Sequence, residues 1–169
     1  MLQVFSFNIS KNVLYYFTNA VVYVGTGGKG ADNMTFRSCN TAQTEEYGER
    51  LASELHAGTV VALFGGMGMG KTALVRGIAR GLSLDAEVSS PTFALVHDYG
   101  GNPPLVHFDM YRVSGWDDLY STGYYDYLDA GAILVIEWSE NIENALPPDA
   151  IRIHLSRVDA DTRLIEREE

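Results

Sequence analysis

Residues 65–72 read Gly-Gly-Met-Gly-Met-Gly-Lys-Thr, and this segment constrains the fold more than any other part of the chain. It matches the pattern G-x-x-x-x-G-K-[ST], in which the backbone N–H groups of a glycine-rich turn surround phosphate oxygens. An apolar run at 59–64 precedes it, and residues 71–82 repeat apolar side chains at helical spacing. A buried strand, a phosphate loop and an amphipathic helix, in that order, predict a nucleotide-binding α/β domain.

The residue types in this segment suit a nucleotide bound with magnesium. Glycines let the backbone turn its N–H groups inward, and the helix N-terminus adds partial positive charge. We expect Lys71 to reach the β- and γ-phosphates and Thr72 to offer its hydroxyl to Mg²⁺. The predicted nucleotide-binding residues are Gly65, Gly66, Met67, Gly68, Met69, Gly70, Lys71, Thr72 and Ala73.

Two acidic residues each follow an apolar run, as expected of a metal-side or catalytic acid. Asp109 follows residues 105–108, and Glu137 follows residues 132–136. Open α/β sheets bind ligands at the carboxyl ends of their strands, so both acids should lie near the phosphate loop. A helix cap or an ion pair is the alternative role for either one alone. Together with Thr72, they form the predicted metal-ligand set.

The segment Ser89-Ser90-Pro91-Thr92 follows the predicted helix and is expected to be an extended loop. Proline fixes one backbone torsion and biases the preceding residue away from helix. The Thr92 hydroxyl could respond to the γ-phosphate and the metal, as in nucleotide switches, or the segment could be an ordinary loop. The four histidines lack metal-ligand spacing and are predicted to be structural.

The rest of the chain alternates between strand and helix patterns, which indicates a sheet that is parallel at its centre. One helix is expected to begin at Thr44 as its N-cap, and the C-terminus should form an antiparallel hairpin that turns near 159–161. Helical pieces are expected within 117–128. Strands are expected at 35–39, 59–64, 93–97, 105–108 and 132–136.

Residues 1–33 hold only three charged residues and differ in composition from the rest of the chain. They are predicted to be a leader outside the working domain, 34–169, and to be either non-native, with Met34 as the true start, or disordered. Their longest apolar stretch, 13–24, is too short to span a bilayer, which takes about 20 residues. No membrane association is therefore expected.

The chain of 169 residues carries 12 Lys and Arg against 22 Asp and Glu, a formal charge of −10. A surface that bound the nucleic-acid backbone tightly would need clustered basic residues, so tight direct binding of RNA is not expected. The single cysteine, Cys39, cannot form an internal disulfide, which favours the reducing cytoplasm.

Between Thr44 and Arg163 the chain contains a series of motifs in a fixed order. These are Gly70-Lys71-Thr72, Arg76-Gly77, Ser90-Pro91-Thr92-Phe93, His107-Phe108-Asp109-Met110-Tyr111-Arg112 and Ile136-Glu137-Trp138. In this series the chain resembles the bacterial TsaE (YjeE) ATPases of tRNA threonylcarbamoyladenosine biosynthesis.

The resemblance implies a P-loop NTPase fold, with a central, mainly parallel sheet flanked by helices and with antiparallel marginal strands. It implies hydrolysis of ATP with Mg²⁺ and action with the TsaB–TsaD complex, which transfers threonylcarbamoyl to adenosine 37 of tRNAs reading ANN codons. It also implies catalytic or metal-side roles for Asp109 and Glu137, a switch-like role for Thr92, and a place for Trp138 at the site.

This sequence departs from the family pattern at two positions. Gly66 stands where the family usually has Asp or Glu, and Ser139 stands where it favours proline. The loss of a carboxylate at Gly66 bears on hydrolysis more than on binding. Two alternatives to an ATPase therefore remain: a nucleotide-dependent binding module with negligible turnover, and a small-molecule kinase. The kinase would need an Arg-rich lid segment, which the sequence does not contain.

Overall fold

The computed structural model describes residues 13–18, 21–26 and 34–168. Most of the predicted leader, 1–33, lies outside the described residues. Its two described segments are the strands β1 (Val13–Thr18) and β2 (Val21–Thr26), which pair with each other in antiparallel fashion. The strand β2 then pairs with β3 (Met34–Ser38), so both segments continue the sheet of the domain.

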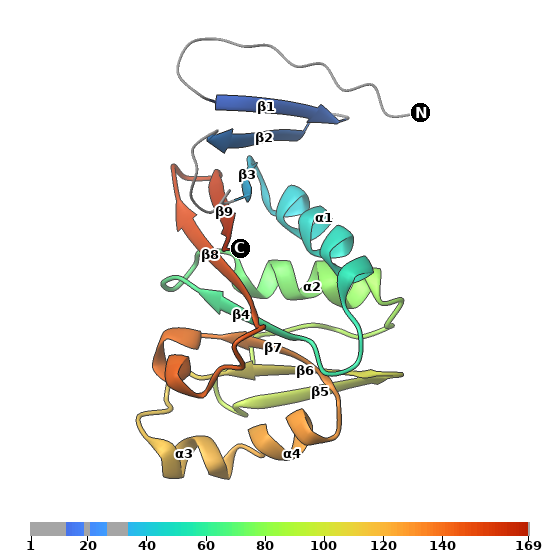
Figure 1. The fold of residues 1–169 in the computed structure, drawn as a ribbon, viewed down its shortest axis with the longest axis vertical. Coiled ribbons are helices and arrows are strands. Elements are labelled where there is room, and N and C mark those ends of the chain that lie inside the picture. The colour runs from blue at the N-terminus through green and yellow to red at the C-terminus, as the bar shows by residue number, and fades with distance from the viewer. Residues whose placement is uncertain (1–12, 19–20, 27–33, 169) are drawn as a thin grey trace.

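The described strands form one sheet in the order β1-β2-β3-β9-β8-β4-β7-β6-β5 (Figure 1). Its four central strands, β8, β4, β7 and β6, are parallel, whereas every pairing outside them is antiparallel. This confirms the predicted mixed sheet with a parallel centre. The remaining bounds are β4 Val60–Phe64, β5 Val96–Gly101, β6 Pro104–Asp109, β7 Ile133–Glu137, β8 Ile151–Arg157 and β9 Arg163–Arg167.

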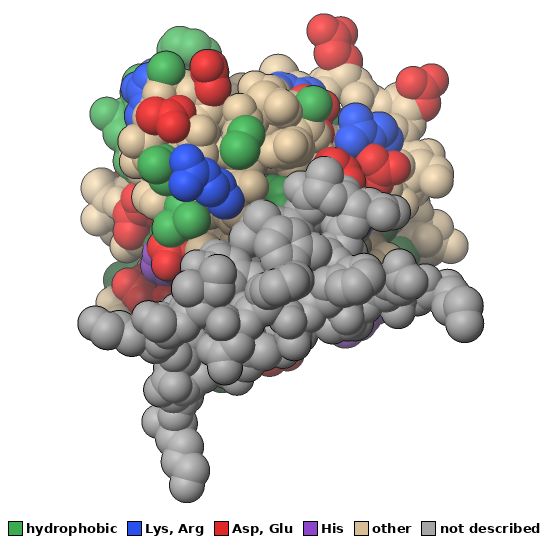
Figure 2. Space-filling model, turned by 90° about the horizontal axis from the view of Figure 1, so that it is seen from above, with side chains coloured by type: hydrophobic (Ala, Val, Ile, Leu, Met, Phe, Trp, Pro, Cys, Tyr) green, Lys and Arg blue, Asp and Glu red, His purple; other side chains and the backbone are tan. Residues whose placement is uncertain are grey.

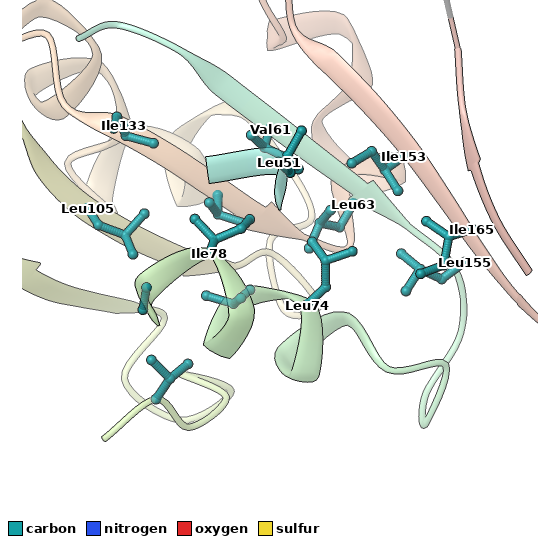
Figure 3. Close-up of a cluster of buried hydrophobic side chains, with 14 of the residues drawn as sticks. Leu51, Val61, Leu63, Leu74, Ile78, Leu105, Ile133, Ile153, Leu155 and Ile165 are labelled. Atoms are coloured by element: carbon teal, nitrogen blue, oxygen red, sulfur yellow. The ribbon is translucent and has the colours of Figure 1, made fainter. Parts of the chain in front are cut away.

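Helices cover both faces of the parallel centre, which explains why its strands are apolar throughout. On one face, α1 (Thr41–Leu51) and α2 (Lys71–Gly81) pack on Val61 and Leu63 of β4 (Figure 3). On the other face, α3 (Trp116–Ser121) and α4 (Tyr124–Asp129) pack with the alternate residues of the same strand. The short helices η1 (Ala52–Glu54) and η2 (Ser139–Ala145) follow α1 and β7.

The helices α1 and α2 approach each other closely at three glycines, of which Gly48 and Gly77 lie in the tightest contacts. A Cβ atom on Gly77 would lie 1.9 Å from the Glu45 carbonyl oxygen, and one on Gly48 would lie 2.3 Å from the Leu74 carbonyl oxygen. Arg76 also pairs with Glu45 at 2.9 Å. This contact fixes α2, and with it the phosphate loop that α2 follows.

Two predicted boundaries are wrong. The first helix begins at Thr41, because Asn40 is the N-cap and accepts a hydrogen bond from the Gln43 backbone N–H, whereas Thr44 is buried within the helix. The strand expected at 93–97 is displaced to 96–101, because the backbone turns at 91–95. The Leu95 N–H closes this turn on the Pro91 carbonyl at 2.6 Å, and Leu95 has a φ of +66°.

The excess of acidic residues does not make every face of the molecule acidic (Figure 2). On the part of the face drawn in colour in Figure 2, basic and acidic side chains lie near each other. Within the described residues, none of the helices has the length and apolar character needed to cross a membrane.

Candidate nucleotide-binding site

The predicted phosphate loop joins the end of β4 to the start of α2, as its sequence pattern requires. Gly68 and Gly70 have φ values of +74° and +101°, a region that favours glycine. Gly65 has a φ of +126°, and a Cβ atom there would lie 2.3 Å from the Leu155 carbonyl oxygen. Gly66 has open space around it and no positive φ. Glycine is therefore required at Gly65, Gly68 and Gly70 but not at Gly66.

The loop borders a cavity of about 600 Å³, a volume suited to a small ligand. The carboxyl ends of β6 and β7 form its opposite wall. The structure thus brings together most of the predicted site residues, although Gly65 and Gly66 lie outside the lining. The predicted residues that line the cavity are Met67, Gly68, Met69, Gly70, Lys71, Thr72, Ala73, Thr92, Asp109, Glu137 and Trp138.

Lys71 is only 4% exposed, and its ammonium group faces the loop. Its Nζ donates hydrogen bonds to the carbonyl oxygens of Gly65 and of Gly66, the latter at 2.8 Å, and lies 4.2 Å from the centre of the Trp138 ring. Burial lowers the pKa of Lys71, while the charges of Glu137, Glu140 and Asp109 oppose that shift. A phosphate at this loop would stabilise the charged form of Lys71, because an opposite charge nearby favours the ammonium group.

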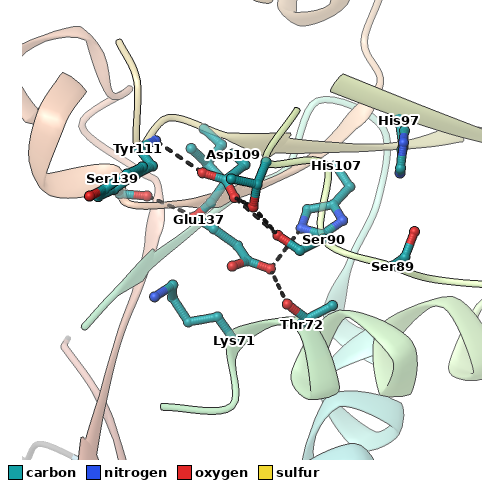
Figure 4. Close-up of polar contacts among 12 residues, drawn as sticks. Lys71, Thr72, Ser89, Ser90, His97, His107, Asp109, Tyr111, Glu137 and Ser139 are labelled. Carbon is teal, nitrogen blue, oxygen red and sulfur yellow. Dashed lines mark hydrogen bonds and ion pairs between the residues drawn. The ribbon is translucent and has the colours of Figure 1, made fainter. Parts of the chain in front are cut away.

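Glu137, at the end of β7, is the acid nearest to the phosphate loop (Figure 4). Its Oε1 accepts a hydrogen bond of 2.7 Å from Thr72 Oγ1 and lies 3.0 Å from His107 Nε2. Sequence reasoning assigned His107 only a structural role, but the structure places it against this acid. Its position two residues before Asp109, on the same face of one strand, is the signal that could have revealed it.

Asp109, at the end of β6, holds the loop that contains Thr92. Its Oδ2 accepts hydrogen bonds from Thr92 Oγ1 at 2.7 Å and from Ser90 Oγ at 3.0 Å. Its Oδ1 accepts a bond of 3.0 Å from the Tyr111 backbone N–H. Both predicted acids therefore line the cavity, and their partners differ: the 90–92 segment bonds Asp109, whereas α2 and β6 bond Glu137. Ser90 is a second hydroxyl at the site that sequence reasoning did not select.

The side chains of Thr72, Asp109 and Glu137 offer hydroxyl and carboxylate oxygens, which are the donors that Mg²⁺ prefers. Magnesium usually binds through one or two carboxylates together with substrate phosphates, rather than in an all-protein cage. In the described part of the chain, no group of three or more His, Cys, Asp and Glu side chains is arranged to hold a metal alone. The residues present thus fit a magnesium ion that is bound together with phosphate.

Arg163 reaches the phosphate loop from the C-terminal hairpin. Its Nη2 lies 3.3 Å from the Gly68 carbonyl oxygen, and its Nη1 donates to the carbonyl oxygen of Thr162 at 3.1 Å. No local pattern could have identified it, because 95 residues separate Arg163 from Gly68. The hairpin therefore adds a cation to the cavity lining.

Comparison with known proteins gives consistent matches. The family model described as "Threonylcarbamoyl adenosine biosynthesis protein TsaE" matches residues 38–165. The tRNA threonylcarbamoyladenosine biosynthesis protein TsaE of Streptomyces coelicolor is 42% identical over 120 residues, which are 69% of this chain and 81% of that protein. The TsaE of Treponema pallidum is 36% identical over 124 residues, covering 73% and 91% of the two chains.

A solved structure agrees with these sequence matches. The crystal structure of Bacillus subtilis YdiB superimposes with a TM-score of 0.68 at 28% sequence identity. The match covers 83% of this chain and 88% of that one.

Proposed function

This chain belongs to the TsaE family, and from that premise we propose that it is a magnesium-dependent ATPase that supports threonylcarbamoylation of adenosine 37 in tRNAs reading ANN codons. Proteins of this family function in tRNA threonylcarbamoyladenosine biosynthesis. We further propose that the chain acts with the TsaB–TsaD complex. The observation that carries the ATPase proposal is the contact between Thr72 and Glu137 beside a complete phosphate loop.

The geometry supports distinct roles for the residues around the cavity. The loop N–H groups and Lys71 would bind the phosphates, and Thr72 with Glu137 would hold the metal. Bound Mg²⁺ would supply charge neutralisation at the phosphates. Asp109 would orient the attacking water or complete the metal site, while Thr92 would report the state of the γ-phosphate through its bond to Asp109. Trp138 would shield Lys71 from solvent.

A second candidate is a nucleotide-dependent binding module with negligible turnover. Gly66 favours it, because a carboxylate is missing at a loop position that has room for one. Both candidates share nucleotide binding, so they differ only in the rate of hydrolysis.

The proposed partner is a protein complex rather than RNA. A chain with 12 basic and 22 acidic residues is poorly suited to neutralise many phosphates of a nucleic acid backbone. Charge complementarity instead favours a basic surface on a protein partner.

The decisive experiment measures phosphate release from ATP by the full chain, alone and with TsaB–TsaD, beside the Lys71→Ala variant. We expect magnesium-dependent release that the partners stimulate and that Lys71→Ala abolishes. Arg80→Ala is the matched control, because Arg80 is an exposed cation on the same helix that pairs with Glu49 away from the cavity. Release that persists in Lys71→Ala would refute the site. Binding without release, with or without partners, would favour the binding module.

We also propose that residues 34–169 form the working ATPase unit. The family match at 38–165 and the cavity-lining residues all lie within that range. Comparing the turnover of the 34–169 fragment with that of the full chain tests this. Equal turnover supports the proposal, and loss of turnover by a folded fragment contradicts it.

A further inference from the structure

A row of polar contacts runs from Glu137 away from the cavity, and Figure 4 shows the first of them, between Glu137 and His107. Glu137 Oε1 lies 3.0 Å from His107 Nε2, and His107 Nδ1 lies 3.3 Å from the Tyr99 hydroxyl. That hydroxyl lies 3.2 Å from the Ser89 carbonyl oxygen, next to the loop that Asp109 holds. The contacts thus reach from Glu137 on β7 through β6 and β5 to the residue before Ser90, whose side chain bonds Asp109.

We propose that His107 is a positioning residue that fixes the Glu137 carboxylate toward Thr72, and that Tyr99 sets the orientation of the His107 ring. This inference rests on the proposed function, because it assigns Glu137 to the metal side of the site. It concerns His107 and Tyr99, which do not line the cavity.

The need for such support arises from the backbone around Glu137. The strand β7 ends at Glu137, and Trp138 has a φ of +60°, so the chain turns sharply beyond the acid. Beyond Glu137 the chain therefore no longer follows the sheet. Glu137 Oε1 accepts hydrogen bonds from Thr72 Oγ1 and His107 Nε2, whereas no hydrogen bond from the described residues reaches Oε2. One oxygen is anchored and the other remains available to a ligand.

His107 is well placed to be that anchor, because its ring cannot move freely. The side chain is 0% exposed, and both ring nitrogens have partners. A carboxylate can only accept hydrogen bonds, so Nε2 carries the hydrogen that faces Glu137. Histidines that orient acidic or metal-binding groups are fixed in this way by a partner on the second nitrogen. Here the Tyr99 hydroxyl is that partner, and its single hydrogen is directed either to His107 Nδ1 or to the Ser89 carbonyl oxygen.

The experiment compares His107→Leu with His107→Gln. The leucine removes the donor to Glu137, whereas the glutamine amide can reach the position of Nε2 and restore it. His97→Gln is the matched control, because His97 is the register partner of His107 on β5 and lies 3.4 Å from Tyr99, but does not contact Glu137. Tyr99→Phe removes the hydroxyl that contacts His107 Nδ1 with little change in side-chain volume. It takes the place of His107→Leu in the test if the leucine variant does not fold.

Two quantities are measured for each variant: the affinity of the ADP complex for Mn²⁺, by electron paramagnetic resonance, and the affinity for ADP without metal. We expect His107→Leu to weaken Mn²⁺ binding by about ten- to a hundredfold, as loss of such support does elsewhere. Metal-free ADP affinity should stay within about twofold. We expect Tyr99→Phe to weaken Mn²⁺ binding less than His107→Leu, and His107→Gln and His97→Gln to bind it like wild type.

Turnover should follow Mn²⁺ affinity across the series. Unchanged Mn²⁺ binding in folded His107→Leu, or in Tyr99→Phe if the leucine variant does not fold, overturns the proposal. So does His107→Gln behaving like His107→Leu, because the donor to Glu137 would then be irrelevant. If the wild type binds ADP and Mn²⁺ but hydrolyses no ATP, the proposed ATPase function fails, while the Mn²⁺ series still decides the role of His107.

Discussion

Thr72 Oγ1 donates a hydrogen bond of 2.7 Å to Glu137 Oε1, although 65 residues separate the two. The bond joins the first turn of α2 to the end of β7. The phosphate loop and the acid at the strand end are therefore parts of one site. Substitutions in the site and in the packing around it can distinguish the contributions of the phosphate loop and of the strand-end acids.

We expect Thr72→Ala to weaken the magnesium-dependent part of ADP affinity by about tenfold or more. The variant loses a hydroxyl that bonds a charged group, and such a bond contributes about 1.5–3 kcal/mol. Isothermal titration with and without Mg²⁺ measures the effect, and Thr72→Ser, which keeps the hydroxyl, is the control. Equal magnesium dependence in all three proteins would contradict the assigned role.

We expect Asp109→Asn to depress ATP turnover by about a hundredfold or more, which is the usual contribution of a positioned acid or base. ADP affinity should change little, because Asp109 lies across the cavity from the N–H groups of the phosphate loop. Single-turnover hydrolysis measures the step. Asp161→Asn is the control, since Asp161 is an exposed acid that lines the same cavity. Normal turnover in Asp109→Asn would rule out a catalytic role.

We expect Gly66→Asp to raise ATP turnover while it alters the free energy of unfolding by less than ~0.5 kcal/mol. A Cβ atom at this position meets no atom within 4 Å, and the backbone there needs no positive φ. Gly66→Asn, which adds the same volume without charge, separates the effect of charge from that of shape. If both variants hydrolyse ATP at the wild-type rate, the departure at Gly66 does not limit hydrolysis.

We expect Gly77→Ala to destabilise the protein by about 1–3 kcal/mol or more, as overpacking does. The added Cβ would lie 1.9 Å from the Glu45 carbonyl oxygen, so α1 and α2 would have to separate. Urea denaturation measures the loss. Gly115→Ala is the control because that position has open space, and equal stability of the two variants would contradict the close helix contact.

Tyr124 should make stability fall with rising pH in the alkaline range. Burial raises its pKa from 10.0 to about 12, and its hydroxyl donates to the Ala145 carbonyl oxygen at 3.1 Å. Between these two pKa values the unfolded chain loses the proton while the folded chain retains it. The contribution of Tyr124 to the free energy of unfolding is thus fully present below pH 10 and decreases up to about pH 12, at up to about 1.4 kcal/mol per pH unit.

Denaturation of the wild type and Tyr124→Phe at several pH values isolates this contribution, because the other tyrosines titrate in both proteins. We expect the stability difference between the two proteins to shrink between pH 10 and 12. A difference that is independent of pH would contradict the assignment.

The central fold could be predicted from local patterns, because burial on both faces demands continuous apolar strands. The runs before Lys71, Asp109 and Glu137 became β4, β6 and β7, and the hairpin at the C-terminus formed where alternation predicted it. The start of α1 was misplaced because Asn40 and Thr44 are both good N-caps, and only packing buries the second.

By itself the sequence determined the phosphate loop, its lysine and the two strand-end acids, since each depends on residue type at fixed spacing. Tertiary structure alone decided which side chains meet those residues. Contacts such as His107 with Glu137 and Arg163 with Gly68 depend on strand order and register, which bring distant segments together. Because a local sequence pattern does not specify strand order, the contacts around the two acids could be identified only in the folded chain.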